Sequence, residues 1–261
     1  MRNTWSIFKK EMSLFFTSPI AYMIIAVYLI LTGYFFYMGI VSFANYVNYM
    51  KTSANPQAME QLSKINIADA VLRPLVYNAS VVILLIMPLL TMRLYSEEFK
   101  TGTIELLLTS PVSHISIVLG KFFASVGVFA LMLALTFTYP AILYVYGNVE
   151  TGPLFTSYFG LFLIGMAFAA VGNFTSTLSK NQVVSAVLGF GVLLLFWVIG
   201  WASYSAEGVL GEFLKSISIM EHFETFAKGV IDSKDMIYYL SFTFIGLFLT
   251  SLSLESTKWR L

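Results

Sequence analysis

The sequence predicts an all-α, polytopic membrane protein with six transmembrane helices. Apolar residues make up 58% of the 261 residues and charged residues only 11%, whereas about 25% of a soluble domain is charged. The charged residues leave six uncharged intervals, each close to or longer than the roughly 20 residues that a spanning helix needs. These intervals lack the alternation typical of barrel strands, and a backbone in hydrocarbon must satisfy its own hydrogen bonds, so helices are predicted.

We place each span inside one uncharged interval, because a charged residue at the bilayer centre costs about 2.5–3.5 kcal/mol. The predicted spans lie near residues 20–43, 75–94, 122–146, 154–178, 183–201 and 237–254. Between them the sequence predicts an inner loop over 95–114 and two long outer loops over 44–73 and 203–235. No repeat or linker separates a second domain, so residues 1–261 are expected to form a single transmembrane domain.

The distribution of basic residues favours a cytoplasmic N-terminus. In that orientation nine of the 15 Lys and Arg residues lie on the inner side, and an excess of these residues is typical of cytoplasmic segments. Six spans then place both termini in the cytoplasm. The nine inner residues are Arg2, Lys9, Lys10, Arg93, Lys100, Lys121, Lys180, Lys258 and Arg260.

An amphipathic helix is predicted over residues 3–18, ahead of the first span. Trp5, Phe8, Met12 and Phe15 recur at intervals of three or four residues, which places them on one face of a helix. A helix of this kind lies in the headgroup plane with its apolar face toward the lipid, so membrane lipids are expected contacts. The alternative is an ordinary inner extension of the first span.

Small residues in the fourth predicted span allow neighbouring helices to approach closely. They are Gly160, Gly165, Ala169, Ala170 and Gly172, a composition typical of helix interfaces in membranes. Packing within the chain and dimerisation both explain it. In the second outer loop, the stretch from Val209 to Val230 is amphipathic, which indicates a short helical hairpin that dips into the outer leaflet.

The sequence offers no site for covalent chemistry. It contains no cysteine, which excludes disulfides and thiolate metal sites. The two histidines, His114 and His222, fall on opposite sides of the membrane in this topology, so no metal site or catalytic pair is predicted and each is expected to be structural. No phosphate-binding loop is present, so any ATP must bind another chain. The net charge of +1 argues against a nucleic-acid partner.

The inner segment after the second predicted span departs from a simple connector. It clusters acidic residues, interrupts its helix with a glycine, and then places leucines on a cytoplasmic segment, where apolar side chains need a partner to cover them. Docking to another protein is one interpretation, and a re-entrant turn that caps the bundle is the other. The residues concerned are Glu97, Glu98, Gly102, Thr103, Glu105, Leu106 and Leu107.

Three stretches carry a resemblance to a known family. SEEFKTGTIELLLTSPVS, from Ser96 to Ser113, resembles the signature loop of ABC-2-type transporter permeases, which holds their coupling helix. HFETFAKGVID is similar to the outer motif of the subgroup related to gliding-motility and nitrous-oxide-reductase-maturation permeases, and KKEMSLFFTSPIAY, from Lys9 to Tyr22, also fits it. The outer-motif residues are His222, Phe223, Phe226, Gly229 and Asp232.

The resemblance implies a half-transporter with a type V exporter-like fold in a bacterial inner membrane. A second permease subunit and two separate cytoplasmic ATPase subunits would complete it, with ATP and magnesium bound by the ATPases and none by this chain. The subunit itself would not be an enzyme. The inner segment would hold the coupling residues, and the amphipathic helix over 3–18 would match the family's connecting helix.

The resemblance leaves two functions open. The first is ATP-dependent export by alternating access. The alternative is a complex in which ATP hydrolysis drives an envelope or motility apparatus without moving a solute, with envelope accessory proteins as further partners. An intramembrane enzyme is disfavoured, because the predicted spans hold almost none of the charged residues or histidines that mark such sites.

Overall fold

The computed structural model describes residues 2–52, 67–147, 151–205 and 208–258. All regular structure within these ranges is helical, which confirms the predicted all-α fold. The helices are α1 (Arg2–Thr17), α2 (Pro19–Thr52), the π-helix η1 (Ala68–Leu72), α4 (Arg73–Thr91), α5 (Arg93–Thr101), α6 (Thr103–Thr109), α7 (His114–Thr136), α8 (Thr138–Gly147), α9 (Thr151–Ser176), α10 (Gln182–Ser205), α11 (Gly208–Ile217), α12 (Ile219–Ala227) and α13 (Ser233–Lys258).

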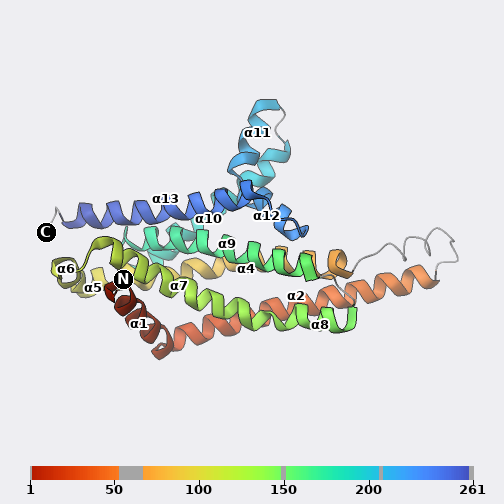
Figure 1. Ribbon diagram of the computed structural model, residues 1–261, viewed down its shortest axis with the longest axis horizontal. Helices are drawn as coiled ribbons and strands as arrows, with labels where there is room; N and C mark the ends of the chain where they lie inside the picture. The colour runs from red at the N-terminus through yellow and green to blue at the C-terminus, as the bar shows by residue number, and fades with distance from the viewer. Residues whose placement is uncertain (1, 53–66, 148–150, 206–207, 259–261) are drawn as a thin grey trace.

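Six helical segments of the described residues are long and apolar enough to cross a membrane, so the predicted number of spans is confirmed. Each of α2, α9, α10 and α13 supplies one span, η1 with α4 and α5 forms another, and α7 with α8 forms the sixth. The chain is a multi-pass membrane protein. Figure 1 shows α6, the start of α1 and the end of α13 at one end of the bundle, which we call the α6 end.

The first spanning helix is longer than predicted. Helix α2 continues to Thr52, so residues 44–52 are helical and their prediction as the start of an outer loop is wrong. A helix of 34 residues is about 51 Å long, well beyond the roughly 30 Å of a hydrocarbon core. The predicted end followed the thickness of the bilayer, whereas no residue of 44–52 stops a helix. Residues 53–66 of that predicted loop lie outside the described ranges.

The bundle is built around α4, α7 and α9. In the most apolar window of each of these spans 67% of the residues are buried, against 17% in α2 and 28% in both α10 and α13. A Cβ atom on Gly165 of α9 would lie 2.0 Å from Phe129 Cε1, and one on Gly172 would lie 2.0 Å from Thr91 Oγ1. Between the two explanations for the small residues of α9, the structure supports packing within the chain.

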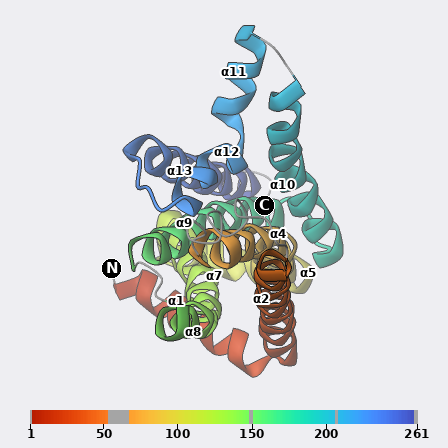
Figure 2. The same cartoon turned by 90° about the vertical axis from the view of Figure 1, so that its right-hand side faces the viewer.

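The predicted outer loop 203–235 contains two short helices, α11 and α12. Helix α12 packs on the bundle through Phe223 and Phe226, which are both fully buried. Helix α11 stands away from the bundle close to α10 (Figure 2), and its apolar side chains Val209, Leu210 and Phe213 are exposed. Exposed apolar side chains on a short helix suit the interfacial region of a membrane, and the position of this stretch in the outer leaflet stays a prediction.

Candidate functional site

The inner segment forms two short helices that meet at Gly102. The spanning helix α4 continues past Met92, whose N–H donates to the Pro88 carbonyl, and runs on as α5 to Thr101. Gly102 has a φ of 75°, a left-handed conformation that ends α5 and that glycine adopts without a Cβ clash. The predicted interruption of the helix at Gly102 is confirmed, and most of the predicted inner loop 95–114 is helical.

The predicted coupling residues divide into an exposed set and an inward set. Ile104 anchors α6, because only 4% of its surface is exposed, whereas its neighbour Leu106 is 74% exposed. Glu98 and Leu107 are half-buried. The exposed members are Glu97, Gly102, Thr103, Glu105 and Leu106. The α5–α6 pair thus presents acidic side chains and a leucine at the surface of the α6 end.

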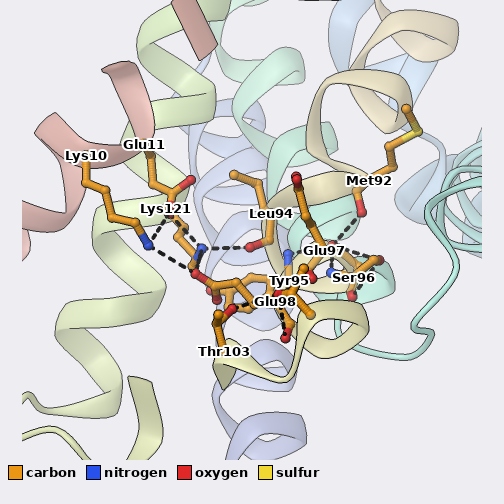
Figure 3. A network of polar contacts seen from close by, with 12 residues as sticks. Lys10, Glu11, Met92, Leu94, Tyr95, Ser96, Glu97, Glu98, Thr103 and Lys121 are labelled. Atoms are coloured by element: carbon orange, nitrogen blue, oxygen red, sulfur yellow. Dashed lines mark hydrogen bonds and ion pairs between the residues drawn. The ribbon is translucent and has the colours of Figure 1, made fainter. Parts of the chain in front are cut away.

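Glu98 belongs to a buried ion cluster centred on Lys121 of α7 (Figure 3). Lys121 Nζ lies 2.8 Å from Glu11 Oε1 of α1 and 3.0 Å from Glu98 Oε1 of α5, and it also donates to the Leu94 carbonyl at 2.7 Å. Lys121 is only 1% exposed. Its charge is therefore compensated entirely by groups of α1 and α5, as a buried ammonium requires.

An open cavity of about 480 Å³ borders this cluster between α1 and α5. Lys10 reaches across its rim, with Nζ 3.4 Å from Glu98 Oε1, and remains 56% exposed. Arg93 also lines the cavity, and its guanidinium lies 4.4 Å from the centre of the Phe15 ring of α1, a cation–π contact. Both sides of the cavity therefore carry cations and carboxylates that hold α1 beside α5.

Serine hydroxyls attach the opposite side of α5 to α9 and α10. Ser176 Oγ accepts hydrogen bonds from the backbone N–H groups of Tyr95 and Ser96, at 3.0 and 3.2 Å, and donates to the Met92 carbonyl at 2.8 Å. The Ser96 and Ser185 hydroxyls lie 2.7 Å apart. All three serines are buried, so α5 is held by polar contacts on both sides.

The predicted apolar face of α1 packs mainly on α7. Phe15 is 1% exposed, Phe8 and Met12 are half-buried against the core, and Trp5 is 56% exposed and stacks on Phe8. Gly120 of α7 permits the close approach of α1, because a Cβ there would lie 2.7 Å from Ile7 Cγ2. Only Trp5 of the four predicted side chains is left largely free for lipid, and the interfacial position of α1 stays a prediction.

The outer motif forms a second buried polar site, far from α6 along the bundle. His222 Nε2 donates to the Ser216 carbonyl at 3.1 Å, and Nδ1 lies 2.6 Å from Asp235 Oδ1 at the start of α13. The imidazole stacks on Tyr238 with ring centres 3.9 Å apart, and Tyr239 donates to the Ile219 carbonyl at 2.7 Å. These contacts fasten the α11–α12 segment to α13, which gives His222 a structural role.

The other outer-motif residues shape the chain around this pair. Phe223 and Phe226 are buried, and Gly229 has a φ of 87°, which turns the chain after α12. Asp232 is exposed and accepts a hydrogen bond from the Lys234 N–H at 2.9 Å, close to the start of α13. The motif is therefore a connection between α12 and α13.

Sequence reasoning missed Glu11, Lys121 and the serines that hold α5. Lys121 stands directly before an uncharged interval, so the sequence predicts it at the inner border of a span. The structure instead places Lys121 inside α7. Its partner Glu11 is 110 residues away in the sequence, and no local pattern connects them. Among the described residues there is no group of three or more His, Asp or Glu side chains that could hold a metal ion.

A comparison with known protein families shows which family the chain belongs to. Residues 5–254 match the sequence model of the ABC-2 family transporter proteins. The chain belongs to this family. The predicted family is confirmed, whereas the subgroup related to gliding-motility and nitrous-oxide-reductase-maturation permeases stays a prediction. This ABC-2 permease is a membrane component of an ABC transporter and not its ATPase, so the family implies ABC ATPase partners. No curated protein matches the chain.

Proposed function

We propose that this ABC-2 permease is one half of an exporter, which pairs with a second permease subunit and two separate cytoplasmic ATPase subunits. The α5–α6 pair supports this proposal, because it exposes Glu97, Glu105 and Leu106 on helices that are anchored in the bundle. An exposed leucine beside acidic residues suits a protein partner better than water. ATP and magnesium would bind the ATPase subunits, whose phosphate-binding loop this chain lacks.

Export would proceed by alternating access in a bacterial inner membrane, with both termini and the α6 end in the cytoplasm. Closure of the ATPases on ATP would displace α6 and α5. Because α5 continues the spanning helix α4 and is hydrogen-bonded to α9 through Ser176, a displacement of α5 would move the spans. A ligand shifts such an equilibrium only through contacts that differ between the two states, and contacts at the α5–α6 pair would supply that difference.

The double substitution of Glu97 and Glu105 by alanine tests this proposal. Both side chains are exposed, so the fold should survive, while affinity for the ATPase that co-purifies with the wild-type chain should fall about tenfold, which corresponds to roughly 1.4 kcal/mol. Binding of the purified ATPase to the permease in detergent measures this. Alanines at the equally exposed Glu212 and Glu255 are the matched control. Equal affinities for both double variants would refute the docking role of α5–α6.

A further inference from the structure

The ion cluster around Lys121 joins helices that are separate in the sequence. We propose that Lys121 is a positioning residue that ties α1, α5 and the adjoining end of α7 into one rigid body, which transmits movement of the ATPase to α1. The inference rests on the proposed function for the source of that movement. The link itself rests on contacts within this chain alone.

The charges make Lys121 indispensable to the link. One ammonium, 1% exposed, neutralises two carboxylates, Glu11 of α1 and Glu98 of α5, whose side chains are 7% and 13% exposed. If Lys121 were neutral, the two carboxylates would face each other in a largely buried site, with Lys10 and Arg93 at the cavity rim as the remaining cations. Like charges in such a site repel strongly, so α1 and α5 would separate.

The packing of α1 on α7 makes the link rigid. At Gly120, the residue before Lys121, a Cβ would lie 2.7 Å from Ile7 Cγ2 and 3.1 Å from the Thr4 carbonyl oxygen. Helix α1 therefore lies directly against the backbone of α7 just where Lys121 reaches Glu11. With α1 and α7 interlocked in this way, the contacts of Glu98 with the buried Lys121 and the exposed Lys10 add α5 to the pair.

The arrangement predicts how the α6 end moves. A force on α6 passes to α5 through Gly102, and from α5 it reaches α1 and α7 through Lys121. The distance between α1 and α5 should therefore stay constant through the ATPase cycle while the spans move. Without Lys121, α5 and α1 should move independently, and ATP hydrolysis should lose its effect on the permease.

Spin labels test the rigid body, because the chain has no cysteine of its own. Labels attached to cysteines at Ser13 of α1 and Lys100 of α5, which are both exposed, report the distance between the two helices by pulsed electron paramagnetic resonance. In the complex with its ATPase subunits, we expect one narrow distance distribution, both without nucleotide and after trapping with ATP and vanadate. In Lys121→Met we expect a distribution at least twice as broad, which changes on trapping, and about tenfold less transport-linked ATP hydrolysis.

Controls separate positioning from simple stability. Lys180→Met removes an exposed lysine and should match the wild type. Lys121→Arg keeps a cation between Glu11 and Glu98 and should retain most of the narrow distribution. If Lys121→Met does not accumulate as folded protein, Glu98→Ala removes the contacts of α5 with Lys121 and Lys10 and should broaden the same distribution.

The outcomes distinguish the inference from the proposed function. A narrow, unchanged distribution in both Lys121→Met and Glu98→Ala would overturn the rigid body. If the wild-type chain bound no ATPase, the proposed function would fail, whereas the distance measurement on the permease alone would still support or refute the link. Broadening in Lys121→Met with wild-type transport-linked hydrolysis would overturn the transmission role.

Discussion

Replacement of Gly165 by valine is expected to prevent stable folding of the permease. A Cβ at this position would lie 2.0 Å from Cε1 and 2.4 Å from Cζ of Phe129, a ring with no exposed surface in the centre of the bundle. Neither α7 nor α9 can retreat without opening contacts with α4 and α13. The loss should lie at or above the upper end of the about 1–3 kcal/mol typical of overpacked cores.

The thermal unfolding midpoint of the detergent-purified chain measures this loss. Gly191→Val in α10 is the matched control, because a Cβ there meets nothing within 4 Å, and it should unfold close to the wild type. Adding Phe129→Ala to Gly165→Val should recover part of the lost stability by removing the clash. Equal midpoints for the two valine variants would show that α9 is not packed as described.

Replacement of His222 by alanine is expected to detach α11 and α12 from α13. Asp235 is 6% exposed and has its carboxylate 2.6 Å from His222 Nδ1, so the substitution leaves a buried carboxylate without that partner. Leaving a buried hydrogen-bonding group without its partner typically costs about 1–3 kcal/mol, and more where the group is charged. The midpoint of thermal unfolding should fall, and protease should cut the segment between α11 and α13 faster.

Two variants show whether the lost stability comes from the pair. Glu212→Ala removes an exposed carboxylate from α11 and should leave both measurements unchanged. His222→Leu combined with Asp235→Leu removes both polar groups and should recover much of the stability, because replacing both partners of a buried hydrogen bond by apolar groups can be nearly neutral. A stable His222→Ala protein would contradict the structural role of the pair.

Charge spacing predicted the spans because a bilayer penalises nearly every charged residue in its interior. Two features do not follow this rule, and charge spacing could not predict them. Residues 44–50 carry no charge but stand beyond the thickness of the hydrocarbon, so composition could not tell helix from loop there. Lys121 is a charge inside a helix, made tolerable by Glu11 and Glu98, and only the folded chain brings these carboxylates together.

The candidate site was predictable in part, for a similar reason. Gly102 and the acidic residues around it formed a local pattern, so the break between α5 and α6 and the exposed face of this pair followed from the sequence. The inward turn of Glu98 did not, because its direction depends on Lys121 of another helix. Likewise, the resemblance located the outer motif, but it could not predict the contact between His222 and Asp235, because that contact depends on the packing of α12 on α13.

A photo-cross-link from α6 to the ATPase shows directly whether the ATPase docks on the α5–α6 pair. A photoreactive amino acid placed at Leu106, which is 74% exposed, should capture the ABC ATPase subunit in membranes that contain the assembled complex. The same amino acid placed at Val209 of α11, which is 84% exposed, should capture none. Capture from position 209 but not from position 106 would contradict the assignment of α5–α6 as the docking site for the ATPase.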